Sequence, residues 1–294
     1  MKIGYPCINT SIGCTSNSTF RLANYSEENL IGKVANNLGC LQKILEYNVT
    51  HGLLFFRISS DIVPFASHPV CEFDWQSYFK KELRSIGSYI KKNGMRISMH
   101  PDQFVLINSP NKKIVESSIR ELSYHCDVLD LMGLDETAKV QIHVGGVYGD
   151  RESAIGRFVS EYRALPAKIK KRLAIENDDR SYPLADCLAI NKETGIPVLF
   201  DSFHHECLNR GEQVEEALKS AAKTWKEKDG LLMTDYSSQA PNARKGSHVT
   251  HIDLDDFKRY LKKTMDTDFD IMLEIKDKEK SALEAVKEVK RIRK

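Results

Sequence analysis

The segment 173–205, LAIENDDRSYPLADCLAINKETGIPVLFDSFHH, carries the pattern that decides the fold. Apolar runs at 173–176 and 197–201 have the length and the composition of buried strands. Between them, Pro183 suits the first turn of a helix and Gly195 suits the residue after its end. A strand, a helix and a second strand in this order form a βαβ unit with two parallel strands. The segment therefore predicts one unit of an α/β protein.

The same alternation continues in both directions along the chain. Eight apolar runs predict strands at residues 2–5, 53–58, 95–100, 139–144, 173–176, 197–201, 231–235 and 270–275. Stretches with a helical spacing of apolar residues separate them, and Ser26 and Asp74 stand where two of these helices would begin. Eight such units in 294 residues average about 37 residues each, which suits a (β/α)₈ TIM barrel with loop insertions.

The number of strands distinguishes two architectures. An open, doubly wound sheet also alternates strands and helices. We favour the barrel because the count is eight and because polar residues recur at the ends of the strands. No segment has the composition of a linker, so we expect a single TIM-barrel domain over residues 1–294.

The overall composition excludes several classes of protein. Lys and Arg number 43 and Asp and Glu 41, so the formal net charge of +2 excludes a strongly basic coat protein and a polyacidic tail. It does not exclude a nucleic-acid enzyme, because the local distribution of charge decides such binding. No apolar run approaches the roughly 20 residues that span a bilayer, and the start of the chain lacks a secretory signal. The seven Cys residues are dispersed without a C-x-x-C pair, which predicts reduced thiols in a cytoplasmic protein.

Residue types that ligate metal ions recur at the ends of the predicted strands and in the loops that follow. In a barrel these strand ends form one rim, where active sites lie. The candidate ligands are His68, His100, His143, Glu176, Asp201, His204, Asp235, His248 and Glu274. One such residue is usually an ordinary polar group, but six strands in succession would gather carboxylates that repel one another and lose solvation. We therefore predict two or three divalent ions; the mixed imidazole and carboxylate ligands favour Mn²⁺, with Zn²⁺ or Mg²⁺ as alternatives.

A cluster of metal ions suits the hydrolysis of phosphate esters. One ion lowers the pKa of a bound water, and the others stabilise charge on the phosphate and on the leaving oxygen. Sugar isomerases and epimerases on the same kind of barrel also use carboxylate and His ligands. The residue types alone therefore leave both reactions open.

Short segments spread over nearly the whole chain show a specific resemblance. They are IGYPC at 3–7, FRISSD at 56–61, SMHPDQF at 98–104, IENDD at 175–179, FDSFHH at 200–205, GSH at 246–248 and MLEIK at 272–276. In this order they resemble the UV damage endonuclease (UvdE) family, which is related in fold to the endonuclease IV class of abasic-site nucleases. The resemblance implies a hydrolase of DNA repair that acts on damaged double-stranded DNA, as a monomer and without a membrane.

The resemblance also implies a reaction. The enzyme would nick the phosphodiester backbone immediately 5′ to cyclobutane pyrimidine dimers and 6-4 photoproducts, with abasic sites as a further substrate, and would leave a 3′-hydroxyl. Its catalytic residues would be Glu176, Glu274 and Asp201.

Particular residues receive roles from the same resemblance. The first ion would be held by His100, His143 and Glu176, the second by Glu176, Asp201 and Glu274, and the third by His204 and His248, with His68 as a further ligand. The residues expected to contact DNA or the lesion are Tyr5, Asn9, Arg57, Gln103 and Phe104; Arg57 is included because it lies near a predicted loop at the barrel mouth. Of these, Tyr5, Gln103 and Phe104 would form a wedge, because aromatic and amide side chains can fill the gap that extruded bases leave.

Two places depart from the family pattern. After the seventh predicted strand the family commonly has Lys-x-His-x-Ser, where this chain has MTDYS at 233–237. Asp235 could still ligate an ion, whereas Met233 cannot replace the Lys. The Tyr that usually follows Gln103 is Phe104, which keeps the ring and loses the hydroxyl. A damage-binding protein with impaired catalysis is therefore a further alternative.

Overall fold

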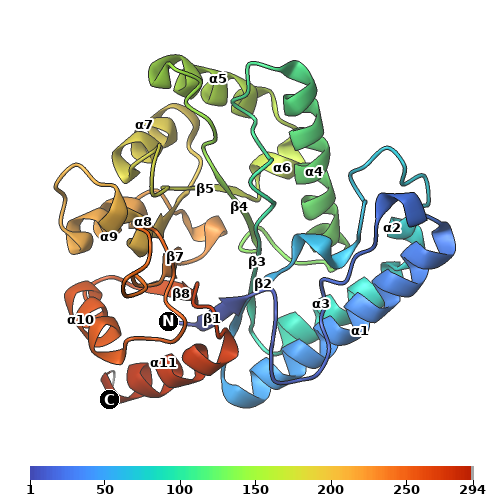
Figure 1. Ribbon diagram of the computed structural model, residues 1–294, viewed down its shortest axis with the longest axis horizontal. Helices are drawn as coiled ribbons and strands as arrows, with labels where there is room; N and C mark the ends of the chain where they lie inside the picture. The colour runs from blue at the N-terminus through green and yellow to red at the C-terminus, as the bar shows by residue number, and fades with distance from the viewer. Residues whose placement is uncertain (293–294) are drawn as a thin grey trace.

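Each predicted apolar run overlaps a strand, and the strands close into a barrel (Figure 1). The computed structural model describes residues 1–292. Its strands are β1 (Ile3–Pro6), β2 (Phe55–Ile58), β3 (Arg96–Met99), β4 (Lys139–His143), β5 (Leu173–Glu176), β6 (Val198–Asp201), β7 (Leu232–Tyr236) and β8 (Phe269–Leu273). Neighbours pair in parallel in the order of the chain, and β8 pairs with β1 through Ile3 opposite Ile271. The prediction of an α/β TIM barrel is confirmed.

Helices surround the strands on the outside (Figure 1). The α-helices are α1 (Glu27–His51), α2 (Trp75–Tyr78), α3 (Lys80–Lys92), α4 (Lys112–Leu131), α5 (Arg151–Ala164), α6 (Ala167–Lys170), α7 (Leu184–Thr194), α8 (Ser202–Cys207), α9 (Val214–Ala222), α10 (Leu254–Thr264) and α11 (Glu279–Ile292). Short 3₁₀ helices are η1 (Leu22–Asn24), η2 (Ser60–Ile62) and η3 (Glu227–Asp229). Ser26 and Asp74 cap α1 and α2 as predicted, because their side chains accept hydrogen bonds from backbone amides in the first turn. Over residues 1–292, no helix has the length and apolar character that a membrane span requires.

A small apolar cluster, separate from the main hydrophobic core, fills part of the barrel. Its buried members are Phe55, Leu199, Met233 and Met272, which come from β2, β6, β7 and β8. Side chains alternate along a strand, so Met233 lies on the same face of β7 as Asp235, which is two residues closer to the end of the strand. Apolar packing therefore supports the strand ends from below, and Met233 belongs to this packing.

The loop between β1 and α1 is tied to the outer layer of helices. Cys14 in this loop and Cys40 in α1 form a disulfide with their Cα atoms 5.9 Å apart. The prediction of reduced thiols is therefore wrong for this pair, whereas the other five Cys residues are free. The 26-residue separation matches no short Cys motif. The two residues meet because the loop runs along α1, where Asn37 bonds to both backbone groups of Ser18.

Candidate metal centre

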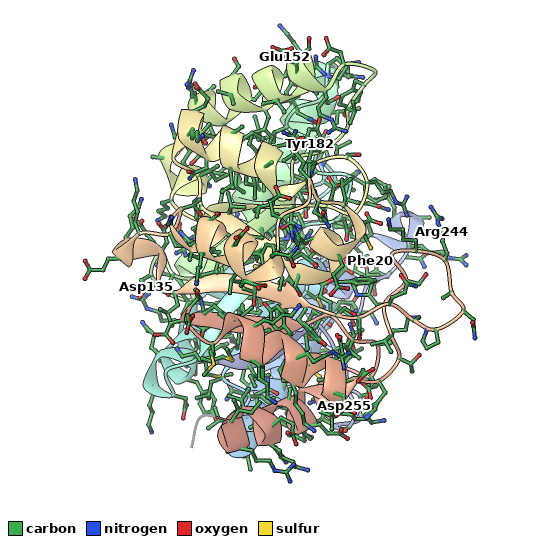
Figure 2. All side chains as sticks on the ribbon, turned by 90° about the vertical axis from the view of Figure 1, so that its left-hand side faces the viewer. Phe20, Asp135, Glu152, Tyr182, Arg244 and Asp255 are labelled. Carbon is green, nitrogen blue, oxygen red and sulfur yellow. A yellow bond between two sulfur atoms is a disulfide. The ribbon has the colours of Figure 1, made fainter. Side chains whose placement is uncertain are left out.

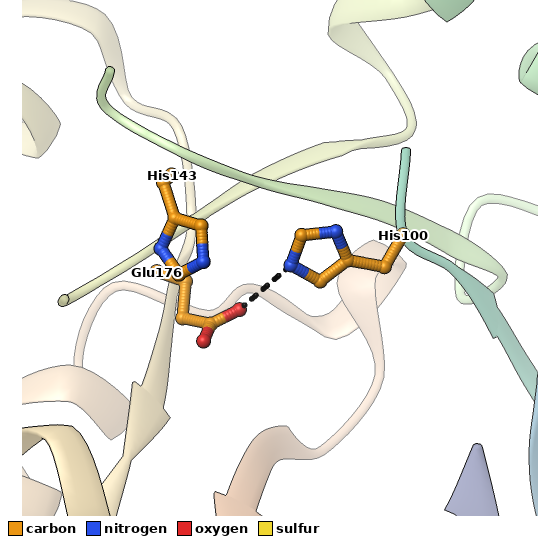
Figure 3. Close-up of side chains that lie close together, drawn as sticks. All are labelled: His100, His143 and Glu176. Atoms are coloured by element: carbon orange, nitrogen blue, oxygen red, sulfur yellow. Dashed lines mark ion pairs between the residues drawn. The ribbon is translucent and has the colours of Figure 1, made fainter. Parts of the chain in front are cut away.

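The carboxyl ends of the strands bring most of the predicted ligands together. Three groups have ligand atoms within 4.8 Å of one another: His100, His143 and Glu176; Glu176, Asp201 and His204; and Asp201, Asp235 and Glu274. Glu176 and Asp201 each belong to two groups, so the three groups form one continuous cluster, called here the rim cluster. Figure 3 shows its first group, in which His100 Nε2 lies 3.5 Å from Glu176 Oε2.

Strand register and a helix start fix these side chains. His143 lies opposite Glu176 in the β4–β5 pair, and Asp201 lies opposite Asp235 in the β6–β7 pair. Asp201 also caps α8, since its Oδ1 accepts a hydrogen bond from the His204 amide at 2.7 Å. The cap turns the His204 ring inward, where Nδ1 lies 3.3 Å from both Glu176 Oε1 and Asp201 Oδ2.

His248 reaches the rim cluster from the long loop between β7 and α10. Gln239 and His248 pair across this loop as an isolated β-bridge, which keeps the loop folded on itself. His248 Nδ1 lies 2.7 Å from the carbonyl oxygen of Glu274, and its Nε2 lies 4.0 Å from Glu274 Oε2. In Figure 2, Arg244 in this loop and Asp135 lie on opposite sides of the molecule. Asp135 precedes β4 and so marks the side on which the strands begin. The loop therefore stands over the barrel mouth.

Burial disfavours the charged forms of two acidic residues in the cluster. Asp201 and Asp235 are 1% and 0% exposed. Burial raises the pKa of Asp201 to about 7, and the negative charges of Glu176 and Glu274 add to this effect against the opposing charge of His204. Burial also raises the pKa of Asp235 well above its ordinary value, despite the nearby charge of Arg57. Both carboxyls therefore tend to keep a proton unless a metal ion lies beside them.

The pKa of the neighbouring His204 imidazole is raised as well, and here the protonated form is the charged one. Burial disfavours the charged form of His204, but the charges of Asp201 and Glu176 raise its pKa to about 11. Burial likewise opposes the charged form of Glu176, but His143, His100 and His204 hold the pKa of this carboxyl well below its ordinary value. Without ions, the cluster therefore holds protons where cations would otherwise lie.

The donor atoms of the rim cluster fit divalent ions. His143 Nδ1 and Asp235 Oδ1 are buried and have no hydrogen-bond partner among the described residues. Burying such atoms without a partner is unfavourable, and a metal ion would provide one. Imidazole nitrogens together with carboxylate oxygens suit Mn²⁺ or Zn²⁺ better than a site made of oxygen ligands alone. The residues present could thus hold metal ions.

A cavity of about 540 Å³ opens beside the rim cluster. Residues that line it include His100, Gln103, His143, Tyr148, Arg180 and His204. Gly145 in its wall has a φ of 115°, and a Cβ there would collide with Asn108 Oδ1, so no other residue fits this position without a shift. Next to the cavity, Gln103 is exposed and Phe104 is 75% exposed. An apolar ring therefore stands free at the mouth, close to the predicted ligands.

Comparison with known proteins identifies the family. A family model described as UV-endonuclease UvdE matches residues 1–294. The chain belongs to the UvdE family. It is therefore an enzyme of DNA repair, a hydrolase that cuts damaged DNA.

Individual relatives agree with this assignment. The UV DNA damage endonuclease of Clostridium perfringens (strain 13 / Type A) is 39% identical over 296 residues, which cover 100% of this chain and 72% of the relative. The crystal structure of SacUVDE has a TM-score of 0.96 and 46% identity, and the match covers 100% of this chain and 99% of that one. Endonuclease IV from Thermus thermophilus has a TM-score of 0.59 and 15% identity over 85% of this chain and 93% of that one, a likeness of fold alone.

Arg57 lies inside the rim cluster and is buried. Its side chain is 4% exposed, its Nη2 donates to Asp235 Oδ2 at 2.5 Å, and its Nη1 donates to Glu274 Oε1. Two carboxylates hold its guanidinium in this structure, and contact of Arg57 with DNA stays a prediction. The segment FRISSD matched the UvdE pattern, but a residue type alone does not tell which partner a long side chain finds.

Sequence reasoning missed Gln141. Its Nε2 donates to Glu176 Oε2 at 2.8 Å and to Asp235 Oδ2 at 2.9 Å, so it links two members of the rim cluster. Gln141 precedes His143 by two residues in β4. The alternation of side chains along a strand places both on one face and could have indicated this residue.

Tyr5 and Asn9 are also buried. Tyr5 is 0% exposed and Asn9 is 2% exposed. The Tyr5 hydroxyl donates to Asn48 Oδ1 at 2.7 Å and accepts from Asn9 Nδ2 at 2.8 Å. This network joins β1 to α1 and to the loop that follows β1. Packing and hydrogen bonds occupy both side chains here, so contact of Tyr5 and Asn9 with DNA stays a prediction and would require this network to open.

His68 stands apart from the rim cluster. It is exposed in the loop after β2, and its Nδ1 accepts a hydrogen bond from the Val70 amide at 3.1 Å. None of the three ligand groups found among the described residues includes it. The expectation that His68 is a ligand thus finds no support in this arrangement.

Proposed function

We propose that the chain nicks the phosphodiester backbone of damaged DNA immediately 5′ to UV photolesions. The substrates would be cyclobutane pyrimidine dimers and 6-4 photoproducts, with abasic sites in addition. Membership of the UvdE family supports a DNA repair endonuclease. The observation that carries the finer proposal is the rim cluster, in which shared carboxylates join three ligand groups beside an open cavity.

Two or three divalent ions, with Mn²⁺ expected first, would occupy the rim cluster. Their ligands would be His100, His143, Glu176, Asp201, His204, Asp235, His248 and Glu274. Bound ions would activate water for attack on phosphorus and would neutralise the charge that develops on the phosphate. Glu176, Asp201 and Glu274 would be the catalytic residues, because they would lie at the reacting phosphate.

Gln103 and Phe104 would open the duplex at the lesion. Both are exposed on the loop after β3, beside the cavity that reaches the rim cluster. Damaged bases stack poorly, so a ring that inserts at that point would need less energy than in intact DNA. Arg180 in the cavity wall and Arg244 on the loop over the mouth would contact phosphates.

The remaining features follow from the substrate. All ligands of the rim cluster come from one chain, so we propose a monomer with one endonuclease domain over residues 1–294. Double-stranded damaged DNA would be its partner, and we propose the cytoplasm as its location, which the five free Cys residues suit.

The test uses purified protein, Mn²⁺ and an end-labelled duplex with a single cyclobutane dimer. We expect one incision immediately 5′ to the dimer and no incision of the undamaged duplex. Binding without incision would support a damage-binding protein, the outcome to which the Met233 and Asp235 departures point. Turnover of a ketose or aldose without DNA binding would support a sugar epimerase and would refute the proposal.

A further inference from the structure

Arg57 places a permanent positive charge at one end of the rim cluster. It forms ion pairs with Asp235 and Glu274, two of the three members of the Asp201–Asp235–Glu274 group. The ion pairs that Glu176 and Asp201 form in the described chain involve His side chains only. The three ligand groups therefore differ: one is entirely acidic and has a fixed cation, and the other two contain His.

Arg57 also reduces the number of oxygens that remain for an ion. Its guanidinium donates hydrogen bonds to Asp235 Oδ2 and to Glu274 Oε1. Asp235 Oδ2 also accepts a hydrogen bond from Gln141. Asp235 Oδ1 remains buried without a partner in the described chain, and Glu274 Oε2 remains 4.0 Å from His248. Each of the two carboxylates can therefore offer one oxygen to an ion in this group.

The charge on Arg57 is permanent and poorly screened. A guanidinium keeps its proton in proteins, and Arg57 is 3% exposed. Solvent ions screen buried charges much less than exposed ones. Any divalent ion bound between Asp201, Asp235 and Glu274 would share its carboxylates with this guanidinium and would be repelled by it.

We propose that Arg57 makes the ion held by Asp201, Asp235 and Glu274 the weakest-bound ion of the centre. This inference rests on the proposed metal centre and deepens it. The ions next to His100, His143 and His204 stay bound under conditions in which this ion dissociates. Arg57 thereby sets the metal concentration at which the centre is complete.

The test is a titration of metal-free protein with Mn²⁺. Calorimetry measures the heat of binding, and the electron paramagnetic resonance signal of free Mn²⁺ measures the ions that remain unbound. The wild type should show tight binding followed by a weaker step. Arg57→Gln removes the charge at similar length and should strengthen the weak step by about tenfold or more, as expected for the loss of a nearby unit charge. Arg57→Lys keeps the charge and is the matched control, for which the weak step should remain.

Other outcomes separate the inference from the proposed function. If the Mn²⁺ affinity of the weak step in folded Arg57→Gln equals that of the wild type, or is lower, Arg57 orients ligands. Either result would overturn the inference. If Arg57→Gln does not fold, Glu274→Gln takes its place: it should remove the weak step alone, and loss of the tight steps would contradict us. A single affinity class in a wild type that incises DNA overturns the inference only. A wild type that neither binds Mn²⁺ nor incises DNA removes the proposed metal centre as well.

Discussion

Glu176 connects two of the three ligand groups through a single buried carboxylate. It is 1% exposed, lies within 3.5 Å of His100 and His204, and accepts a hydrogen bond from Gln141. A change at this one carboxylate therefore alters the charge of both groups while the strands that carry it keep their packing.

We expect Glu176→Gln to reduce incision by about a thousandfold or more, since removal of one charged group that acts in the transition state has effects of this order. The measurement is the single-turnover rate on a dimer-containing duplex with Mn²⁺. Glu152→Gln makes the same change on the exposed start of α5 and should leave the rate unchanged (Figure 2). Near-normal nicking by Glu176→Gln would exclude Glu176 from the reaction.

Binding of ions should release protons. His204 has a pKa of about 11 and Asp201 a pKa of about 7 in the protein without ions, so at neutral pH His204 carries a proton that a metal ligand must lose. Protons compete with metal, so Mn²⁺ affinity should rise with pH from about 5 to above 7. Calorimetry in buffers with different ionisation enthalpies measures the protons released. An affinity independent of pH would contradict the assignment of His204 as a ligand.

Single residues were predictable where a strand end fixed their direction. His100, His143, Glu176 and Asp201 end or follow strands, so the barrel geometry alone brought them to one rim. Long side chains behaved differently. The partners of Arg57 and Tyr5 depend on which buried groups lie within reach. The local sequence does not predict these partners.

The loop after β3 is the element in which recognition of the lesion would reside. Phe104 on this loop is 75% exposed, more than any other large apolar side chain among the exposed ones described. A single exposed ring is common on protein surfaces, so its place next to Gln103, which lines the cavity, is what favours a role in recognition.

Replacement of Gln103 and Phe104 by Ala should weaken binding of a dimer-containing duplex by about tenfold or more, because stacking of a base on an aromatic ring contributes roughly 1–3 kcal/mol. Metal content should not change, since neither residue belongs to the rim cluster. Fluorescence anisotropy and metal analysis measure the two quantities. Met265→Ala, which removes another exposed apolar side chain, is the control. Loss of metal from the double variant would show that the loop supports the centre instead.

The loop between β1 and α1 depends on its disulfide. The 26-residue separation that Cys14–Cys40 closes implies a contribution of about 3.5 kcal/mol to the free energy of unfolding. Cys14→Ser should lose this amount in urea denaturation, and reduction of the wild type should have the same effect. Cys207→Ser alters a free Cys and serves as the control. Equal stability of the wild type, the reduced protein and Cys14→Ser would mean that the bond does not form in solution.

Elements were predictable to within a few residues because apolar runs mark buried strands. The run at 173–176 coincides with β5. The short helix α8 was not anticipated, although it starts at the residue after Asp201. Its start depends on the side chain of Asp201 acting as a cap, and a carboxylate at a strand end can equally serve a ligand or a loop.

At the scale of the whole molecule, the formal charge of +2 hides a separation of charge. Four carboxylates lie in the rim cluster against one guanidinium, while Arg180 and Arg244 lie at the mouth. The electrostatic potential that a phosphate backbone meets therefore depends on whether cations occupy the cluster.

Removal of ions by EDTA should abolish incision and should also weaken binding of the dimer-containing duplex by about tenfold or more, because the cluster would lose the positive charge of the ions that attracts phosphate. Anisotropy titrations with and without Mn²⁺ measure the change in affinity. The effect should be smaller at high salt, which screens charge at the mouth. Equal affinity with and without ions would place the DNA away from the rim cluster.

The closure of the barrel by β8 against β1 has a consequence for synthesis on the ribosome. Glu274 follows β8, and β8 is the last barrel strand to leave the exit tunnel, so a growing chain carries an open sheet and an incomplete ligand set until β8 has emerged. Nuclease activity would then begin only after this final strand has docked. With the proposed ligand set, a nascent chain would not cut nucleic acid while most of its barrel is still being made.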